Sequence, residues 1–164
     1  MYNRNMQKQF KVMFVCLGNI CRSPMAEFVM KDKLKERGLD HVIKVFSTAT
    51  SYSENGNPVY PPAVEKMKKE GVTIYPHVSV TIEKEDYDKY DMIVAMESRN
   101  IERMMLKFIN DPDHKISRLL DYTDNPRDIA DPWYSGNFDR AYLDIVEGVD
   151  GLIDFIVRER LFRN

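Results

Sequence analysis

Short apolar runs alternate with amphipathic stretches along the chain, and this alternation predicts both strands and helices. Buried strands are expected at 12–15, 41–47, 91–96 and, with an edge position, 115–119. Apolar residues at three- and four-residue spacing predict helices at 23–37, 61–70, 97–108 and 138–157, with a short helix within 81–90. Because strands and helices alternate, we expect an α/β fold: a small, doubly wound, four-stranded parallel sheet with helices on both faces.

Two segments lack these periodic patterns. Residues 1–10 are mostly polar and are expected to be an extension that precedes a single domain of residues 11–164. Residues 48–62 are rich in Ser, Asn, Gly and Pro, which predicts a surface loop leaving the carboxyl edge of the sheet. Tyr52 is the first aromatic residue of this loop, so it is a candidate for the wall of a pocket at that edge, and an exposed tyrosine that packs locally is the alternative.

Composition and charge restrict the classes of function. The chain has 24 basic and 26 acidic residues, a balance that argues against nucleic acid or a membrane surface as partner. No stretch has the length of a membrane span or the pattern of a signal peptide. Cys16 and Cys21 are the only cysteines, and three scattered histidines add no ligand cluster, so neither a disulfide scaffold nor a metal site is expected. We expect a cytoplasmic protein without a cofactor.

The stretch of residues 12–24 is the most informative, because an apolar strand ends there at Cys16 and a polar loop leads into a helix. Gly18 and Asn19 are residue types that tolerate positive φ, so the loop can curl and point successive backbone N–H groups at an anion. Ser23 is a good N-cap and is followed by proline, a good first helical residue. The positive end of the helix is therefore expected to face the loop.

This arrangement favours the thiolate of Cys16, which is the nucleophilic form of cysteine. Arg22 closes the loop, and its planar guanidinium can hold two oxygens of a phosphoryl group. The Ser23 hydroxyl can donate to the thiolate or to a departing sulfur. An inert buried thiol is the alternative, but it would leave Arg22 and Asn19 unexplained. The residues expected to bind phosphate are Leu17, Gly18, Asn19, Ile20, Cys21, Arg22 and Ser23.

A cysteine that cleaves a phosphate monoester needs an acid to protonate the leaving oxygen. Asp131 is the candidate, and Pro132 restricts it to an extended conformation. Trp133 and Tyr134 follow and are expected to wall a flat substrate. An ordinary Asp-Pro turn is the alternative, and the cysteine loop upstream favours the catalytic interpretation.

The segments Cys16-Leu-Gly-Asn-Ile-Cys-Arg22-Ser-Pro and Asp131-Pro-Trp-Tyr134 resemble the signature loop and the general-acid segment of the low-molecular-weight protein tyrosine phosphatases. The resemblance covers nearly the full chain and implies a flavodoxin-like phosphatase fold. It also implies a two-step hydrolysis of phosphotyrosine in proteins or peptides, and of small aryl phosphates. Cys16 would attack phosphorus, Arg22 would hold the transition state, and Asp131 would protonate the leaving group and then activate water, releasing inorganic phosphate.

By motif position, the resemblance assigns support of the loop to Asn19, Ser23, Ser47 and His77. Ser47 ends the second predicted strand, at the same edge of the sheet as Cys16, although a solvated serine is the alternative there. The segment 48–57 departs from the family pattern, and Ser53 takes the place of a common aromatic. The resemblance therefore does not specify the substrate preference of this chain.

Three alternatives use a similar site. A thioredoxin-coupled arsenate reductase needs two further cysteines, and the chain has none after Cys21. A protein-arginine phosphatase typically has threonine at the position of Ile20. A non-catalytic phosphate-binding module does not require Cys16, Arg22 and Asp131 together. Cys21 itself is expected either to capture an oxidised Cys16 as a reversible disulfide or to pack as an inert thiol.

Overall fold

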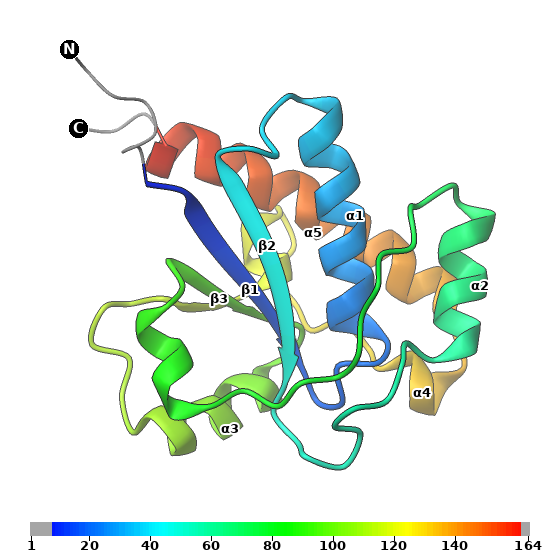
Figure 1. Ribbon diagram of the computed structural model, residues 1–164, viewed down its shortest axis with the longest axis horizontal. Coiled ribbons are helices and arrows are strands. Elements are labelled where there is room, and N and C mark those ends of the chain that lie inside the picture. Colours follow the sequence, from blue (N-terminus) through cyan, green and yellow to red (C-terminus); the bar gives the residue numbers. More distant parts are fainter. Residues whose placement is uncertain (1–7, 162–164) are drawn as a thin grey trace.

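The structure is a computed structural model that describes residues 8–161, and its centre is a sheet of parallel strands in the order β2-β1-β3-β4. The strands are β1 (Phe10–Cys16), β2 (Ile43–Ala49), β3 (Met92–Ala95) and β4 (Ile116–Arg118). The α-helices are α1 (Arg22–Glu36), α2 (Pro61–Lys69), α3 (Ser98–Phe108), α4 (Pro132–Ser135) and α5 (Phe138–Ile156) (Figure 1). Single turns are the 3-10 helices η2 (Lys84–Asp88) and η3 (Leu119–Tyr122) and the π-helix η4 (Val157–Leu161). The predicted four-stranded parallel α/β fold is confirmed.

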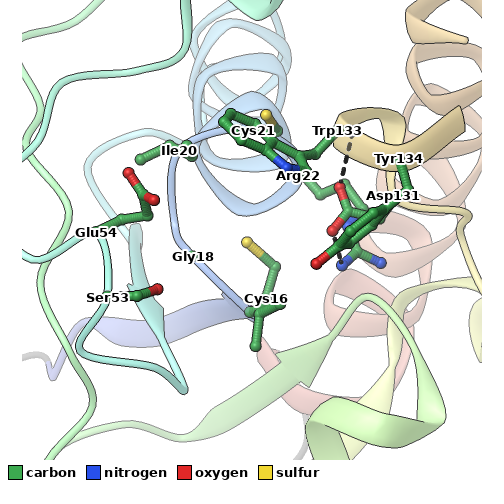
Figure 2. A pocket seen from close by; sticks show the side chains of 11 residues that line it. Cys16, Gly18, Ile20, Cys21, Arg22, Ser53, Glu54, Asp131, Trp133 and Tyr134 are labelled. Carbon is green, nitrogen blue, oxygen red and sulfur yellow. Dashed lines mark hydrogen bonds and ion pairs between the residues drawn. The ribbon is translucent and has the colours of Figure 1, made fainter. Parts of the chain in front are cut away.

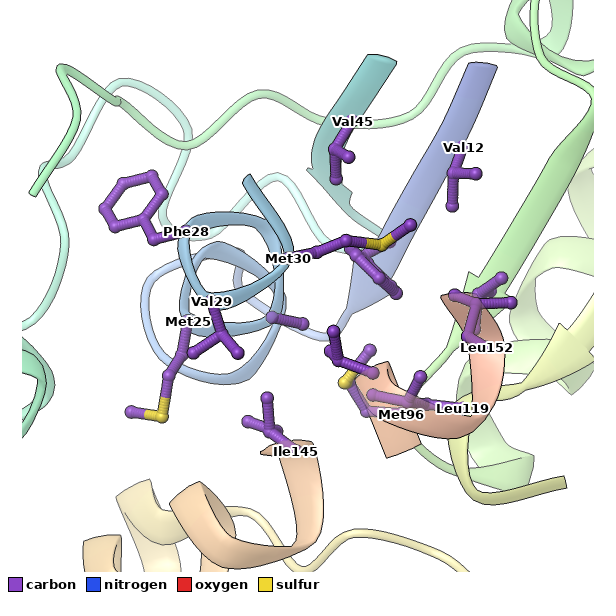
Figure 3. Close-up of a cluster of buried hydrophobic side chains, with 14 of the residues drawn as sticks. Val12, Met25, Phe28, Val29, Met30, Val45, Met96, Leu119, Ile145 and Leu152 are labelled. Atoms are coloured by element: carbon purple, nitrogen blue, oxygen red, sulfur yellow. The ribbon is translucent and has the colours of Figure 1, made fainter. Parts of the chain in front are cut away.

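Different helices cover the two faces of the sheet, because successive side chains of β1 point to opposite faces. Val12 and Phe14 join the larger hydrophobic cluster, where α1 and α5 pack on the sheet (Figure 3). Met13 and Val15 join the smaller cluster with α3 and η2. All four side chains are fully buried, which explains why this run is apolar at every position rather than at alternate ones.

Several element bounds differ from the prediction. β1 begins at Phe10, inside the segment expected to be an extension, because Phe10 pairs with Ile43 of β2; residues 1–7 of that segment lie outside the described residues. β2 is shifted by two residues along the chain, so Ala49 rather than Ser47 ends it. Ala49 pairs with Cys16, and both strands therefore end at the same level.

The start of α1 also differs. The prediction that Ser23 caps this helix is wrong, because the helix begins at Arg22 and the N-cap position belongs to Cys21, whose side chain makes no capping bond. The Ser23 hydroxyl instead contacts Cys16 and Asn19. A residue that suits an N-cap is thus used inside the helix, for a contact across the loop.

The strand order places the β1–α1 loop at the point where the connections diverge, since β2 lies on one side of β1 and β3 on the other. Ligands of open parallel sheets bind outside the carboxyl ends of the strands at such a point. The loop after β2 and the segment before α4 reach the same edge (Figure 1). Among the described residues, no helix combines the length and the apolar character needed to cross a membrane.

Candidate active site

Cys16 is the last residue of β1, and its thiol lies inside the turn that the following residues form. Its Sγ accepts a hydrogen bond from the Asn19 backbone N–H at 3.2 Å and lies 3.0 Å from the Ser23 Oγ. Asn19 adopts φ of 58°, in the left-handed region that asparagine tolerates better than most residues. The loop therefore curls around Cys16 at Asn19, whereas Gly18 does not adopt positive φ.

The Asn19 side chain holds this loop in place through hydrogen bonds. Its Nδ2 donates to Ser23 Oγ at 2.7 Å and to Ser47 Oγ at 3.0 Å. The Ser47 hydroxyl in turn donates to Glu27 Oε1 at 2.6 Å. Because Ser23 accepts from Asn19, its own hydrogen is available to the sulfur of Cys16 at 3.0 Å or to the Thr48 carbonyl at 3.4 Å. A buried chain of polar groups thus holds the Ser23 hydroxyl beside the Cys16 sulfur.

His77 completes the support on the other side of Asn19. The Asn19 Oδ1 accepts from the Val80 backbone N–H at 3.2 Å and lies 3.1 Å from His77 Nε2. Since that oxygen can only accept, His77 is assigned the tautomer that carries its hydrogen on Nε2. Burial lowers the pKa of His77, and the nearby Glu27 carboxylate offsets this only in part. The ring is therefore neutral at neutral pH and donates to Asn19.

Arg22 is almost fully buried and is held by three groups. Its Nη1 donates to the Glu97 carboxylate and to the Ile129 carbonyl at 2.7 Å, and its Nη2 donates to Asp131 Oδ2 at 3.2 Å. Burial disfavours the charge, but electrostatic interactions with Cys16, Asp131 and Glu97 outweigh it and raise the pKa of Arg22. Within residues 8–161 its Nε is buried and has no hydrogen-bond partner. The guanidinium is therefore held in place, and its Nε–H has no acceptor among these residues.

Asp131 directs one carboxylate oxygen to Arg22 and uses the other to begin α4. Its Oδ1 accepts from the Trp133 backbone N–H at 3.1 Å, and its backbone is extended at φ −77° and ψ 113°, as Pro132 requires. The helix that follows was not predicted, because four residues are too few to show helical periodicity. The Trp133 ring packs on Tyr60, with centroids 4.6 Å apart. The acid is thereby held at the edge of an aromatic surface.

These groups line one pocket with a cavity volume of about 120 Å³. Figure 2 shows Cys16 between two walls, one formed by Ile20, Ser53 and Glu54 and the other by Asp131 and Tyr134. Asn19 and Ser23 are fully buried behind the loop and do not line the pocket. The lining residues are Cys16, Leu17, Gly18, Ile20, Cys21, Arg22, Ser53, Glu54, Asp131, Trp133 and Tyr134.

The prediction that Tyr52 walls the pocket is wrong. Its side chain is 63% exposed, and Lys107 Nζ lies 4.9 Å from the centre of its ring. The next two residues, Ser53 and Glu54, line the pocket instead. The direction of a loop side chain depends on the path of the whole loop, and no periodic pattern in the sequence records that path.

Two acidic residues of the site were missed by the sequence analysis. Glu97 follows β3 closely, and its position at the carboxyl edge was a usable signal, because parallel strands present such residues to a common site. Glu54 had no such signal. It comes so close to the loop that a Cβ added to Gly18 would lie 3.2 Å from its Cγ. The pocket therefore combines an arginine with a carboxylate on the opposite wall.

Cys21 lies in the same pocket as Cys16, and both cysteines are free thiols. Burial, reinforced by the negative charge of Cys16, raises the pKa of Cys21 to about 12. Cys21 is thus a neutral thiol at neutral pH.

Sequence comparison identifies relatives over most of the chain. The profile of the family described as low molecular weight phosphotyrosine protein phosphatase matches residues 11–161. The low molecular weight protein-tyrosine-phosphatase YfkJ of Bacillus subtilis is 37% identical over 153 residues, which span 91% of this chain and 97% of YfkJ. PtpA of Staphylococcus aureus, with the same description, is 38% identical over 151 residues, which span 90% of this chain and 94% of PtpA.

Solved structures agree with the sequence matches. The crystal structure of YfkJ superposes with a TM-score of 0.92 at 34% identity, covering 95% of this chain and 99% of YfkJ. The crystal structure of DARP, drosophila arginine phosphatase, gives a TM-score of 0.80 at 28% identity, covering 94% and 100% of the two chains. The chain therefore belongs to the low-molecular-weight protein tyrosine phosphatases, a family of cysteine-dependent phosphatases that act on phosphoproteins.

Proposed function

We propose that the protein hydrolyses phosphotyrosine in proteins and peptides, and small aryl phosphates, through a cysteinyl-phosphate intermediate. The observation that carries this proposal is the unpaired Nε of Arg22, buried in the same pocket as the thiol of Cys16 and the carboxylate of Asp131. Leaving a buried donor unpaired costs about 1–3 kcal/mol. A phosphoryl oxygen bound above Cys16 supplies the missing acceptor.

In the first step, the Cys16 thiolate attacks phosphorus, so that an S–P bond forms while the P–O bond to the leaving group breaks. Arg22 and the backbone N–H groups of the loop hold the equatorial oxygens. Asp131 gives its proton to the departing phenolate oxygen. Its contact with Arg22 keeps the carboxyl beside the phosphoryl group.

In the second step, Asp131 takes a proton from water as the water attacks the cysteinyl phosphate, and inorganic phosphate leaves. The electron pair of the S–P bond returns to Cys16, where the Ser23 hydroxyl donates to the sulfur. The side chains of Asn19, Ser47 and His77 keep Ser23 and the loop in place and touch no reacting atom, whereas the Asn19 backbone N–H donates to the Cys16 sulfur. Their proposed role is positioning.

The walls of the pocket support an aromatic ester as substrate. Trp133 and Tyr134 present rings at its mouth, and a phenyl ring packs on such surfaces through stacked or edge contacts. The free thiols of Cys16 and Cys21 suit a reducing compartment, so the cytoplasm is the proposed location. The proposed partners are tyrosine-phosphorylated proteins, and neither a cofactor nor a metal takes part in the proposed steps.

Phosphoarginine is the second candidate substrate, because the carboxylate of Glu54 faces the pocket and can pair with a guanidinium. One of the structural relatives is an arginine phosphatase from drosophila. Steady-state hydrolysis of phosphotyrosine and phosphoarginine peptides, in chelator and with Glu54→Gln alongside the parent, distinguishes the two. We expect phosphotyrosine to be preferred and the variant to retain it. A preference for phosphoarginine that Glu54→Gln abolishes would replace the proposal.

The chemical roles are tested with phenyl phosphates of graded leaving-group pKa. Asp131→Asn is expected to lower kcat by about 10²–10³-fold for basic leaving groups, and much less for nitrophenolate, which departs without a proton. Cys16→Ser is expected to abolish turnover of every ester while still binding phosphate, since Arg22 remains. A deficit for Asp131→Asn that does not grow with leaving-group pKa contradicts the assignment of the acid.

A further inference from the structure

A second hollow of about 600 Å³ adjoins the catalytic pocket, and we refer to it as the α3 groove. Leu17, Asp131 and Tyr134 line both the pocket and the groove. One side of the remaining wall is the first half of α3, where Arg99 and Arg103 line the hollow, and the other side includes residues 128–130. A polypeptide whose phosphotyrosine occupies the pocket can therefore extend along this groove without leaving the surface.

The acidic side chains of the α3 groove are already paired. Glu97 and Asp131 both bind Arg22. Asp128 accepts from the Ser98 backbone N–H at 2.8 Å and from Arg118 at 3.0 Å. Although burial disfavours its charge, these bonds lower the pKa of Asp128. Each acidic side chain of the groove thus already has a basic partner within the protein, although Glu97 and Asp131 share the one guanidinium of Arg22.

The basic side chains of the α3 groove are not paired in this way. Arg99 and Arg103 are exposed, and across the described residues 8–161 neither has an ion pair or hydrogen bond to a carboxylate. They are one helical turn apart, a spacing at which like charges repel. Arg99 also lies in the first turn of α3, where the helix dipole disfavours a cation. Both guanidiniums are therefore unfavourably placed and are available to an anion outside the chain.

We propose that the α3 groove binds carboxylate side chains that flank the phosphotyrosine in the substrate, with Arg99 and Arg103 as their partners. This inference rests on the proposed function and specifies its substrate class as phosphotyrosine within an acidic sequence. The arginines recognise charge beside the reacting group and take no part in the chemical steps. Because both are exposed, the preference they give is modest and is weakened by salt.

The test compares phosphotyrosine peptides that differ only in their flanking residues, acidic in one and neutral in the other. In the parent we expect kcat/KM to be about five- to tenfold higher for the acidic peptide, the effect of two exposed charge pairs. The double variant Arg99→Gln, Arg103→Gln is expected to bring this ratio close to one. Raised ionic strength is expected to reduce the ratio in the parent only.

The matched control is Lys68→Gln, Lys69→Gln, which removes the same charge from exposed positions on α2, at the other end of the molecule from α3 (Figure 1). It is expected to keep the acidic preference. p-Nitrophenyl phosphate, which is too small to reach α3, reports on the pocket of each variant and normalises the peptide rates.

The possible outcomes distinguish the proposal about the α3 groove from the proposed function. The proposal about the α3 groove is wrong if the parent turns over both peptides at equal rates, or if the arginine variant keeps the acidic preference. Either result leaves the proposed function standing. If the Lys68, Lys69 control also loses the acidic preference, the preference comes from the overall charge of the protein. That result also contradicts the proposal about the α3 groove. No turnover of either peptide by the parent overturns both proposals.

Discussion

Cys21 is a protonated thiol at neutral pH, and it lines the same pocket as Cys16. With a pKa raised to about 12 by burial and by the charge of Cys16, Cys21 is not the thiol that peroxide attacks first. Oxidation of Cys16 to the neutral sulfenic acid removes the negative charge that helps to raise this pKa. Cys21 then becomes a better nucleophile at the moment when a disulfide can form.

The resulting prediction concerns recovery from oxidation. Attack of the Cys21 sulfur on the sulfenic acid of Cys16 forms the disulfide and releases water, and a reductant then restores both thiols. After peroxide and reductant, the parent should regain most of its aryl phosphatase activity and Cys21→Ser distinctly less, with Cys16 found as sulfinic acid by mass spectrometry. The untreated variant controls for any direct effect of the substitution. Equal recovery of the two proteins would make Cys21 a packing thiol.

His77 makes stability depend on pH. Because burial lowers its pKa below the ordinary 6.5, the unfolded chain binds a proton between the two values while the folded protein does not. The unfolding free energy should therefore fall as the pH drops below 6.5, by up to about 1.4 kcal/mol per pH unit. Two charged residues of α1 act on the pKa of His77: Glu27 raises it, and Lys31 lowers it further.

The measurement is urea unfolding at pH about 7.5 and about 5.5. His77→Gln should show a smaller loss on acidification than the parent, since its amide can still donate to Asn19 but does not titrate. His41→Gln, at an exposed position, should behave as the parent does. If His77→Gln loses as much unfolding free energy on acidification as the parent does, the pH dependence comes from other groups.

At the scale of residues, local chemistry allowed some placements to be predicted but not others. Cys16, Arg22 and Asp131 were brought together in one pocket as expected, because a strand end, a curled loop and an Asp-Pro segment each constrain the backbone locally. Glu54 was missed and Tyr52 misplaced, because their directions depend on contacts between two loops.

At the scale of elements, α5 depends on two glycines where it packs against η3. A Cβ added to Gly151 would overlap the backbone carbonyl of Tyr122, whereas one added to Gly148 would meet the side chain of Leu119. Alanine normally stabilises a helix relative to glycine by about 1 kcal/mol. A loss of stability when either glycine is replaced by alanine would therefore come from the close packing against η3.

Gly151→Ala is expected to lower the unfolding free energy by about 1–3 kcal/mol, because the backbone of η3 must move away from α5. Gly148→Ala is expected to cost less, since the Leu119 side chain has other rotamers. Urea or thermal unfolding of both variants checks the order. A Gly151→Ala protein as stable as the parent would mean that α5 and η3 can separate without loss.

Long periodic elements were predictable from the sequence and short ones were not. α5 and α3 were expected within a few residues of their observed bounds, since each presents a continuous apolar face. α4 was missed and β2 was displaced by two residues. In β2 the bounds are set by pairing with β1, a long-range contact that a local pattern does not contain.

At the scale of the whole molecule, β1 connects the loop of residues 17–21 to the cores on both faces of the sheet. Phe14 belongs to one cluster and Val15 to the other, and Cys16 follows at once. The alternation of strands and helices was enough to predict a parallel sheet, and the loop at its carboxyl edge followed from that. Because the loop is anchored in both cores, it is expected to keep its shape until the domain unfolds.

Phosphate binding should therefore be linked to global stability. A ligand bound only by the folded protein, at about a hundred times its Kd, raises the unfolding free energy by about 2.7 kcal/mol. The parent and Cys16→Ser should show this gain in urea unfolding with phosphate, relative to chloride of equal ionic strength. Arg22→Lys should show a much smaller one, since lysine lacks the planar pair of donors.

Phosphate also stabilises proteins generally, by exclusion from their surface, and that part of the gain should be equal in parent and variant. The difference between their gains isolates the site, whatever stability Arg22→Lys loses through its contacts with Glu97 and Ile129. Equal gains would mean that phosphate acts on the surface alone. The buried guanidinium would then be a structural cation, and the oxyanion site would have to be sought elsewhere.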